Sequence, residues 1–344
     1  MNIELLMENL DLTTFDHAPS ITSLEQLEKA YVCRLQDQAL LKISGDDAAS
    51  FLHNQLSNDV ERLKAGEARY AAYCTPKGRM LASFYYWKHD GAIFMLCAAN
   101  LLPALQKRLQ MFVLRAKVKI EEVSADYLIL ALGGGKNGTP QAFDVPNPTE
   151  IHGVIADADN FLIRREDSLH TQHFISLIKR TDAEKLLNKL IGDFQVVNAG
   201  IWRLAQIYAG VAQVQEQIKE QFVPQMLNFE LIGGVNFRKG CYPGQEIVAR
   251  SQYLGKLKRR MAIARVEGVN LDQVQAGAEL FSEDDLEQPC GMVVTAERDL
   301  DGVVIALVEI KLSAHESDKV HLANAAGPSL TFQVLPYAYV DVTE

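Results

Sequence analysis

The sequence predicts an α+β protein that ends in a small antiparallel β-barrel. Residues 39–122 follow the order strand, helix, strands, helix, strand, without the regular alternation of a doubly wound sheet. After Gly255 the chain consists of short strands separated by turn residues, which is typical of a small antiparallel barrel. A length of 344 residues with 48% hydrophobic residues is enough for two or three domains.

The first unit begins near Leu24 and is predicted to contain two helices and a β-hairpin. Apolar residues at helical spacing predict a helix over 48–56, and Asn100 is expected to cap a helix that runs to Phe112. Pro76-Lys77-Gly78 has the composition of a tight turn, so the strands on either side are expected to pair. Strands are predicted at residues 39–43, 68–75, 79–88, 92–97 and 116–122.

A second unit of similar kind is predicted to begin at Tyr127. Thr181 to Glu184 has the pattern of a capping box that opens a helix to about Ile191. A further helix over 198–212 carries Trp202, and residues 221–240 are expected to be mostly loop. The remaining strands are predicted at 127–132, 161–165, 174–179, 261–267, 279–281, 292–296, 303–311 and 330–334.

Composition excludes several classes of protein. The five cysteines are far apart and lack any C-x-x-C spacing, so neither a disulfide framework nor a zinc site is expected. Residues 1–20 contain acidic residues and no basic region, unlike a signal peptide, and no apolar run approaches the ~18 residues of a membrane span. We therefore expect a reduced, cytoplasmic protein without a membrane partner or a bound metal.

Two motifs lack the context that their function requires. Gly133 to Gly138 matches G-x-G-x-x-G, but a dinucleotide site needs a helix next, and three prolines follow within a dozen residues. His170 and His173 have a spacing found in metal sites, but no further ligand stands nearby. We expect the first to be a loop and the histidines to have a surface or structural role.

The charge is unevenly distributed. The whole chain has a formal net charge of -10, whereas residues 236–265 hold eight basic residues against Glu246 alone, a net charge of +7. Such a local positive field favours an anionic ligand or local phosphate contacts over broad coating of a nucleic acid. A solvated basic hairpin is an equally open interpretation. The basic residues are Arg238, Lys239, Arg250, Lys256, Lys258, Arg259, Arg260 and Arg265.

The most unusual stretch is residues 237–246, FRKGCYPGQE, which we call the signature loop. Two glycines and a proline around Cys241 make it a poor helix and a poor strand, and glycines permit close approach to the backbone. Positive charge on Arg238 and Lys239 favours the thiolate form of the cysteine. Gln245 and Glu246 offer the paired donor and acceptor groups that recognise the edge of a flat heterocycle.

Lys239 to Glu246, K-G-C-Y-x-G-Q-E, resembles the signature of the YgfZ family, folate-binding proteins related to the aminomethyltransferase of glycine cleavage. The resemblance covers the chain from about residue 37 to 337. It includes FLHNQLSNDV at 51–60, PKGR at 76–79, the stretch from Gln221 through Gly234, and Leu335-Pro336-Tyr337.

The resemblance implies two α+β domains and a C-terminal barrel around a central ligand-binding cavity. It implies a first domain made of residues 24–122 with about 198–254, a second ferredoxin-like domain of 123–197, and a barrel of 255–344. It further implies binding of tetrahydrofolate or another folate, and support of tRNA thiolation and of iron–sulfur enzymes. The expected partners are iron–sulfur tRNA-modifying enzymes, indirectly or transiently.

Several positions depart from the family pattern. Relatives that cleave glycine carry an acidic pair in the first hairpin, where this sequence has Ala82 and Ser83, so aminomethyl transfer by that mechanism is not expected. Trp202 matches a tryptophan that contacts folate in the family, although a plain core role is also open to it. Gln38 replaces a second family tryptophan, and Tyr208 stands where relatives often have a pterin-binding Glu, changes that weaken pterin binding.

Three functions remain open at this point. The first is a folate-dependent accessory factor with Cys241 as its functional thiol, the second a one-carbon enzyme with a changed mechanism, and the third a protein that binds tRNA directly through the +7 segment. Lys256, Lys258, Arg259 and Arg260 are expected to hold the glutamate tail of folate or a nearby phosphate. The expected folate-binding residues are Trp202, Tyr208, Lys239, Gln245, Glu246, Arg250 and Lys256.

Overall fold

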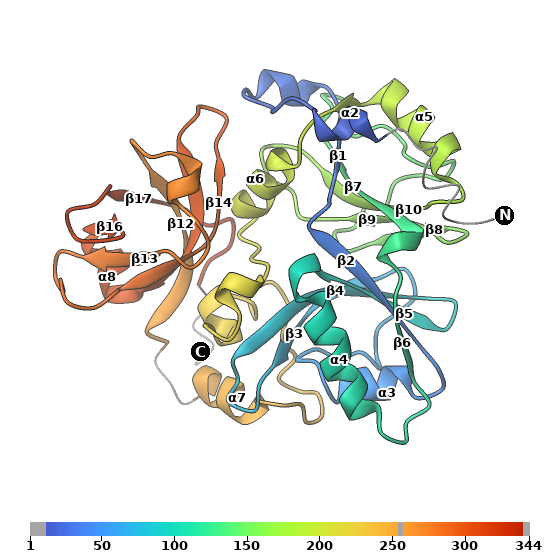
Figure 1. Cartoon of the computed structure of the whole chain (residues 1–344), viewed down its shortest axis with the longest axis horizontal. Coiled ribbons are helices and arrows are strands. Elements are labelled where there is room, and N and C mark those ends of the chain that lie inside the picture. The colour runs from blue at the N-terminus through green and yellow to red at the C-terminus, as the bar shows by residue number, and fades with distance from the viewer. Residues whose placement is uncertain (1–11, 254–256, 340–344) are drawn as a thin grey trace.

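Three β-sheets form three lobes, and the segment that follows residue 198 runs between them (Figure 1). The computed structural model describes residues 12–253 and 257–339. The first two lobes combine sheets with helices, and the third is an antiparallel half-barrel. The predicted α+β class with a C-terminal antiparallel barrel is therefore confirmed.

The first sheet has five antiparallel strands in the order β3-β4-β5-β2-β6. The predicted hairpin is present, because β3 and β4 pair across the turn at Pro76-Lys77-Gly78. The predicted first helix ends three residues early, at His53, and β6 begins at Lys119. The elements of this lobe are β2 (Gln38–Ser44), α3 (Ala48–His53), β3 (Ala68–Cys74), β4 (Met80–His89), β5 (Ala92–Ala98), α4 (Leu102–Val113) and β6 (Lys119–Glu122).

The second sheet has six strands in the order β11-β1-β7-β10-β9-β8. Only the β1–β11 pair is parallel. Helix α5 covers one face with leucines at helical spacing, which pack with Phe143. Its elements are α2 (Thr13–Asp16), β1 (Tyr31–Arg34), β7 (Tyr127–Gly133), β8 (Val154–Asp157), β9 (Asn160–Arg164), β10 (His173–Lys179), α5 (Ala183–Asp193) and β11 (Gln195–Val196).

The third sheet is antiparallel, in the order β16-β13-β14-β15-β12-β17. Its elements are β12 (Arg259–Val266), β13 (Glu279–Ser282), β14 (Gly291–Arg298), β15 (Val304–Lys311), α8 (Leu312–Ser317), β16 (Val320–Leu322) and β17 (Leu330–Gln333). Alternate residues of β15 face opposite ways. Ala306 and Val308 join the core inside the half-barrel, whereas Ile305 and Leu307 join the core shared with the other lobes.

The connecting segment contributes two helices, α6 (Gly200–Tyr208) and α7 (Gln245–Tyr253). Helix α6 packs on β14 and β15 and so joins the third lobe to the rest. Trp87 and Phe161 join the first two sheets, with ring centroids 5.4 Å apart. A continuous core thus fixes the lobes against one another. Short 3-10 turns occur at Glu25–Glu28, Ala99–Leu101, Ser124–Asp126, Glu216–Ile218, Pro224–Leu227 and Leu271–Gln273.

Three local features differ from the sequence-based expectations. Helix α7 was not predicted, because its sequence QEIVARSQY has little amphipathic pattern. Strand β1 precedes the first sheet in sequence but pairs with β7 in the second. The predicted capping box does not form, since α5 begins at Ala183 without a side-chain cap and Asp182 instead accepts a hydrogen bond from Asn160.

The glycine motif at 133–138 and the histidine pair at 170 and 173 both have structural explanations. Residues 134–138 form a loop with no helix after it, and three of its glycines have positive φ. His173 is fully buried, with Nδ1 2.9 Å from the Tyr31 hydroxyl, and burial lowers its pKa to about 4. His170 is exposed. Of the helices in the described ranges, none has the length and apolar character needed to cross a membrane.

Candidate ligand-binding site

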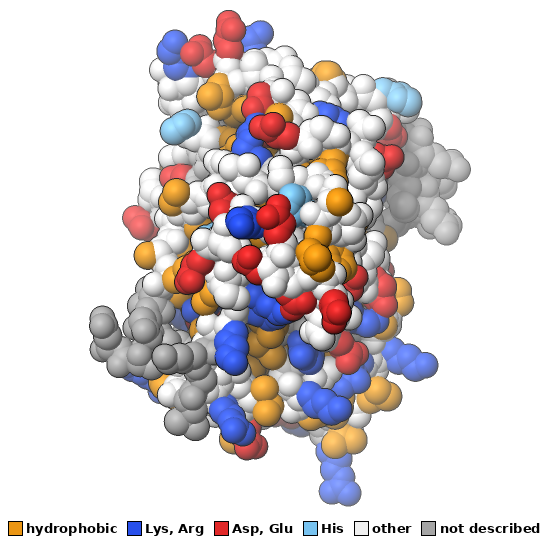
Figure 2. All heavy atoms as spheres, turned by 90° about the vertical axis from the view of Figure 1, so that its left-hand side faces the viewer, with side chains coloured by type: hydrophobic (Ala, Val, Ile, Leu, Met, Phe, Trp, Pro, Cys, Tyr) orange, Lys and Arg blue, Asp and Glu red, His pale blue; other side chains and the backbone are white. Residues whose placement is uncertain are grey.

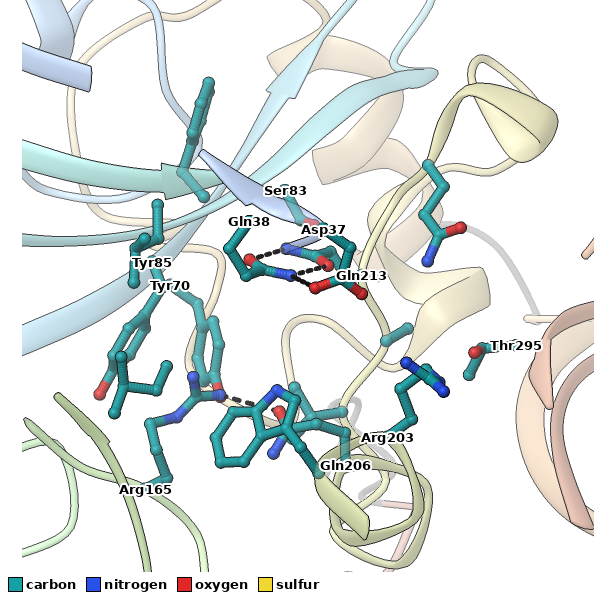
Figure 3. A pocket seen from close by; sticks show the side chains of 17 residues that line it. Asp37, Gln38, Tyr70, Ser83, Tyr85, Arg165, Arg203, Gln206, Gln213 and Thr295 are labelled. Carbon is teal, nitrogen blue, oxygen red and sulfur yellow. Dashed lines mark hydrogen bonds between the residues drawn. The ribbon is translucent and has the colours of Figure 1, made fainter. Parts of the chain in front are cut away.

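A cavity lies where the three lobes meet, and we call it the central cavity. Its wall combines Ser83 of the first sheet, Ile175 of the second and Thr295 of the third with Trp202 and Gln206 of α6 (Figure 3). A pocket at the junction of domains with a mixture of apolar and polar groups is the usual setting for a small-molecule site.

Arg165 is the most enclosed charged group of the cavity wall. Its side chain is 4% exposed, and its guanidinium carbon lies 4.2 Å from the centroid of the Tyr85 ring. The rings of Tyr70 and Trp202 are 5.2 Å and 5.5 Å away. Three aromatic rings therefore surround one planar cation, an arrangement favoured by cation–π attraction.

The charge of Arg165 is compensated within the protein. Its Nε donates to Glu166 (3.3 Å), and its Nη2 donates to the Tyr70 hydroxyl and to Oε1 of Gln206 (3.1 Å). Burial acts to lower the pKa of Arg165, but Tyr70 and Glu166 outweigh burial and hold that pKa above its usual value. The guanidinium is thus a permanent and firmly positioned part of the wall.

Gln206 has a donor without a partner. Trp202 and Gln206 are one turn apart on α6, so both side chains reach the same wall. Oε1 of Gln206 accepts a hydrogen bond from Arg165, but Nε2 is buried and has no hydrogen-bond partner within the part of the chain that the structure describes. Buried donors are nearly always satisfied, so this amide is available to an acceptor on a ligand in the cavity.

The opposite part of the wall is made of amides and a carboxylate. Gln38 and Gln213 form two reciprocal hydrogen bonds of 2.8 Å (Figure 3). Asp37, beside them, is exposed and is the one carboxylate among the residues that line the cavity. Gln38 therefore lies on the cavity wall, but its amide is already paired with Gln213.

A polar network lies behind the aromatic rings. The Tyr70 hydroxyl donates to Glu166 (2.7 Å), and the Tyr85 hydroxyl lies 3.0 Å from Nδ1 of His152. Burial lowers the pKa of His152. Burial acts to raise the pKa of Glu166, but the charges of Arg165 and His152 outweigh it and hold this pKa low. The network keeps Glu166 ionised opposite Arg165.

Tyr208 does not line the central cavity. It lies six residues after Trp202 on α6, which places it on another side of the helix. Its hydroxyl donates to Asp299 (2.6 Å), which also accepts from Arg265 (2.5 Å). Tyr208 thus joins α6 to the third lobe, and the structure does not place it with Trp202 as predicted.

Lys239 of the signature loop is an anchor rather than part of the cavity wall. Its Nζ donates to the carbonyl oxygens of His53 and Leu56 (2.8 Å for the latter), at the end of α3. Its ammonium also lies 4.8 Å from the centroid of the Tyr242 ring. Burial lowers the pKa of Lys239 to about 8, although Asp59 and Cys241 act in the opposite direction.

Gly244 is explained by backbone packing. It has φ +84, and a Cβ atom there would lie 2.7 Å from Cα of Gly78 and would also overlap the Thr75 carbonyl oxygen. The loop therefore presses against the β3–β4 turn. The close approach predicted for a ligand is made by the protein's own backbone. Gly240 has no such constraint, since its nearest neighbour would be His53 Nε2 at 3.5 Å.

The other predicted site residues of the loop and α7 face away from the central cavity. Cys241 is exposed, as are Glu246 and Arg250, and Gln245 is half-buried. Lys256 lies outside the described residues. Among the described residues, none of these lines the cavity that holds Trp202, so the structure does not bring the predicted folate-binding set together.

The +7 segment is largely neutralised in the fold. Arg260 forms a buried ion pair with Glu230, and Arg259 contacts Glu309 at 2.8 Å. Arg265 is paired with Asp299 and Asp301. The structure gives no support to the prediction that Arg259 and Arg260 hold the glutamate tail of folate or a nearby phosphate, because carboxylates of the chain already pair with both. Lys258 is exposed.

Of the two hairpin positions where the resemblance implied an acidic pair in glycine-cleaving relatives, only position 83 lines the cavity. Ala82 is buried, and Ser83 lines the cavity, where its hydroxyl accepts a hydrogen bond from the Val214 N–H (3.0 Å). This hydroxyl is therefore engaged with the backbone.

Most residues of the wall were missed from the sequence, among them Gln206, Arg165 and Asp37. Gln206 had a detectable signal, since it lies one helical turn after Trp202. Arg165 and Asp37 had none, because charged residues at a strand end and in a turn are ordinarily exposed.

The comparisons agree with this architecture. The GCVT N-terminal domain family matches residues 27–142. The tRNA-modifying protein YgfZ of Photobacterium profundum is 26% identical over 332 residues, covering 94% of this chain and 96% of that protein. Its counterpart in Klebsiella pneumoniae is 28% identical over 310 residues, covering 89% and 93%. The aminomethyltransferase T of the glycine cleavage system from Bartonella henselae superposes with a TM-score of 0.73 at 18% identity, covering 92% of this chain and 89% of that one.

Motif, length and fold thus agree: the chain is similar over nearly its whole length to YgfZ proteins, and it has the fold of the glycine-cleavage aminomethyltransferase.

Proposed function

We propose that this protein binds tetrahydrofolate or a related folate in the central cavity and supports tRNA modification, specifically thiolation, and the iron–sulfur enzymes that perform it. The observation that carries the proposal is the unpaired Nε2 of Gln206 beside Trp202. The curated relatives, which match nearly the whole chain, are named tRNA-modifying proteins.

The residues present fit a pterin. A pterin is a flat heterocycle with donors and acceptors on its edge, and it needs an apolar face and polar groups beside it. Trp202 and the tyrosine rings supply faces, Gln206 supplies a free donor, and the Asp37 carboxylate can accept from ring N–H groups. Tetrahydrofolate, when bound, supplies a carrier for one-carbon units.

The chain's own groups position such a ligand but do not supply a base at the hairpin. Arg165 holds the Gln206 amide and the surrounding rings in place. Ala82 and Ser83 provide no carboxylate, so we propose an accessory role rather than aminomethyl transfer. A one-carbon transfer by a changed mechanism would have to use the exposed Asp37, which is the only carboxylate of the wall.

We further propose that Cys241 is the functional thiol. It is exposed, whereas the four other cysteines are buried. Lys239 is close enough for its charge to interact with that of Cys241. The accessory role predicts that Cys241→Ala fails to restore tRNA thiolation in a bacterial strain lacking its own YgfZ, whereas Cys97→Ala restores it.

Folate binding is tested by titrating the protein with tetrahydrofolate while recording tryptophan fluorescence and, separately, heat. Trp87 is fully buried against Phe94 and Phe161 and is not among the residues that line the central cavity. We expect quenching in wild type and in Trp87→Phe, and loss of quenching in Trp202→Phe. Quenching that depends on Trp87 alone, or the absence of saturable heat, would contradict the proposal.

A further inference from the structure

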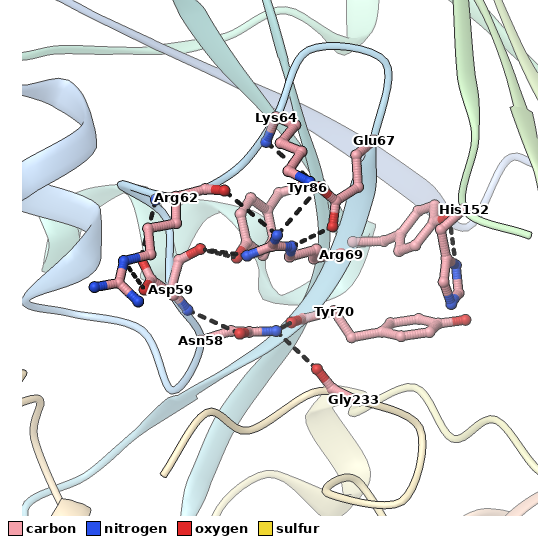
Figure 4. A network of polar contacts seen from close by, with 11 residues as sticks. Asn58, Asp59, Arg62, Lys64, Glu67, Arg69, Tyr70, Tyr86, His152 and Gly233 are labelled. Carbon is pink, nitrogen blue, oxygen red and sulfur yellow. Dashed lines mark hydrogen bonds and ion pairs between the residues drawn. The ribbon is translucent and has the colours of Figure 1, made fainter. Parts of the chain in front are cut away.

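A second hollow lies on the other side of Tyr70, which contributes to the walls of both cavities. The hollow is bounded by β3, by the turn at Ile151 and His152, and by the segment from Ile232 to Arg238, with Tyr253 at its edge. Figure 4 shows Tyr70 and His152 together with Asn58, whose amide joins β3 to Gly233. These contacts make the hollow a built feature of two segments far apart in sequence.

The hollow offers aromatic and apolar surface that the protein leaves uncovered. Tyr253 is 57% exposed although it is aromatic, and it meets Phe237 edge to face with centroids 5.7 Å apart. Ile151 at the opposite edge is 48% exposed. Phe237 holds the Tyr253 ring in position, so a flat ligand can stack on it at little cost in side-chain entropy.

Two arginines line the hollow, and they differ in their ion pairs. Arg69 is bound by Glu67 (2.5 Å) and by the backbone carbonyl oxygen of Asp59 (3.1 Å). Arg238 is exposed, and within residues 12–253 and 257–339 its side chain has no ion pair. On the face seen in Figure 2, which views the molecule from the side of the third lobe, Lys and Arg side chains gather low, whereas Asp and Glu are more frequent higher up.

We propose that this hollow binds an unpaired nucleotide of RNA, with the base stacked on Tyr253 and the phosphate at Arg238. Stacking on an aromatic ring, a nearby arginine, and side chains that can reach base edges are the features by which proteins bind single-stranded RNA. Asn236 lines the hollow, and while its Oδ1 accepts a hydrogen bond from the Arg238 N–H, its side-chain NH2 group can donate to a base edge. A single nucleotide site also suits a chain whose net charge of -10 opposes broad contact with RNA.

The position of the hollow relates it to the signature loop. Phe237 and Arg238 directly precede Lys239, Gly240 and Cys241. A nucleotide in the hollow therefore lies on the same loop as the exposed thiol, which gives the loop a second use besides anchoring on α3. This inference rests on the proposed role in tRNA modification, since it names the partner that the role requires.

The test measures fluorescence anisotropy of a labelled single-stranded RNA of about twelve nucleotides, a length within the site sizes of single-strand binders. Tyr253→Ala is expected to weaken binding roughly tenfold, the effect of one lost stacking contact. Arg238→Ala is expected to weaken it about fivefold and to reduce the salt dependence by about one phosphate contact. Phe112→Ala and Arg115→Ala, exposed controls that line neither cavity, should change it less than about twofold.

Two results would overturn the inference: a fully paired duplex that binds as tightly as the single strand, or loss of affinity that is equal in the site and control variants. Tetrahydrofolate is titrated into the same preparations. Folate binding without any RNA binding rejects this inference and leaves the proposed folate site intact. RNA binding that depends on Tyr253 without folate binding supports the hollow and rejects the folate proposal.

Discussion

The central cavity and the signature loop each contain a buried cation, and the two are stabilised differently. Arg165 in the cavity has Glu166 and three aromatic rings around it, and its pKa is raised. Lys239 in the loop has two carbonyl oxygens and no ion pair among the described residues, and burial lowers its pKa to about 8. The cavity thus holds a permanent charge, whereas the loop holds one that can be lost near physiological pH, beside an exposed thiol.

The largest expected effect comes from Arg165→Met. The change leaves the half-buried Glu166 without the buried Arg165 cation and removes hydrogen bonds to Tyr70 and Gln206. Removing one partner of a buried ion pair costs about 3–5 kcal/mol. Urea unfolding should show a loss of this size. Arg238→Met, at an exposed position, should stay within about 0.5 kcal/mol of wild type. Equal stability of the two variants would show that the buried contacts of Arg165 do not stabilise the fold.

A smaller effect is expected at Lys239 and depends on pH. The unfolded chain keeps the Lys239 proton up to its ordinary pKa of 10.5, whereas the folded protein releases it near 8. The unfolded state therefore binds more protons between these values, and stability rises with pH through this window. Wild type should gain up to about 3 kcal/mol relative to Lys239→Met between pH 8 and 10.5. Parallel stability curves for the two proteins would show that the lysine is not buried as described.

The central cavity and the signature loop also differ in how much of each could be predicted from the sequence. The fold class, the hairpin, most barrel strands and the family followed from periodicity, turn residues and the motif at 239–246. The cavity wall did not, because Asp37, Arg165 and Gln206 come together only through the packing of separate lobes. The conspicuous glycines and lysine of the signature loop indicated a ligand, yet Gly244 and Lys239 contact the protein's own backbone. A strong motif identifies the family more directly than it identifies the walls of its binding site.

The loop's role as a packed element can be tested with its two glycines. Gly244→Ala places a side chain at φ +84 against Gly78 and Thr75, and we expect a loss of about 2 kcal/mol. Gly240→Ala meets only His53 Nε2 at 3.5 Å and has no positive φ, so it should be nearly neutral. Thermal unfolding of the pair measures the difference. If both substitutions are equally harmful, the constraint comes from something other than the β3–β4 turn.

The smallest effect concerns the affinity of the central cavity for tetrahydrofolate. Gln206→Met keeps the length of the side chain but removes the free Nε2 donor and also the Oε1 acceptor of Arg165, so tetrahydrofolate should bind at least about tenfold more weakly, the effect of one lost hydrogen bond to the ligand. Tyr208→Phe on the same helix is the control, because its hydroxyl serves Asp299 and not the cavity. It should lose about 1 kcal/mol of stability and leave folate affinity unchanged. Calorimetric titration of both variants with tetrahydrofolate measures these affinities. If Tyr208→Phe binds folate more weakly and Gln206→Met does not, the pterin does not lie against the wall that contains Gln206.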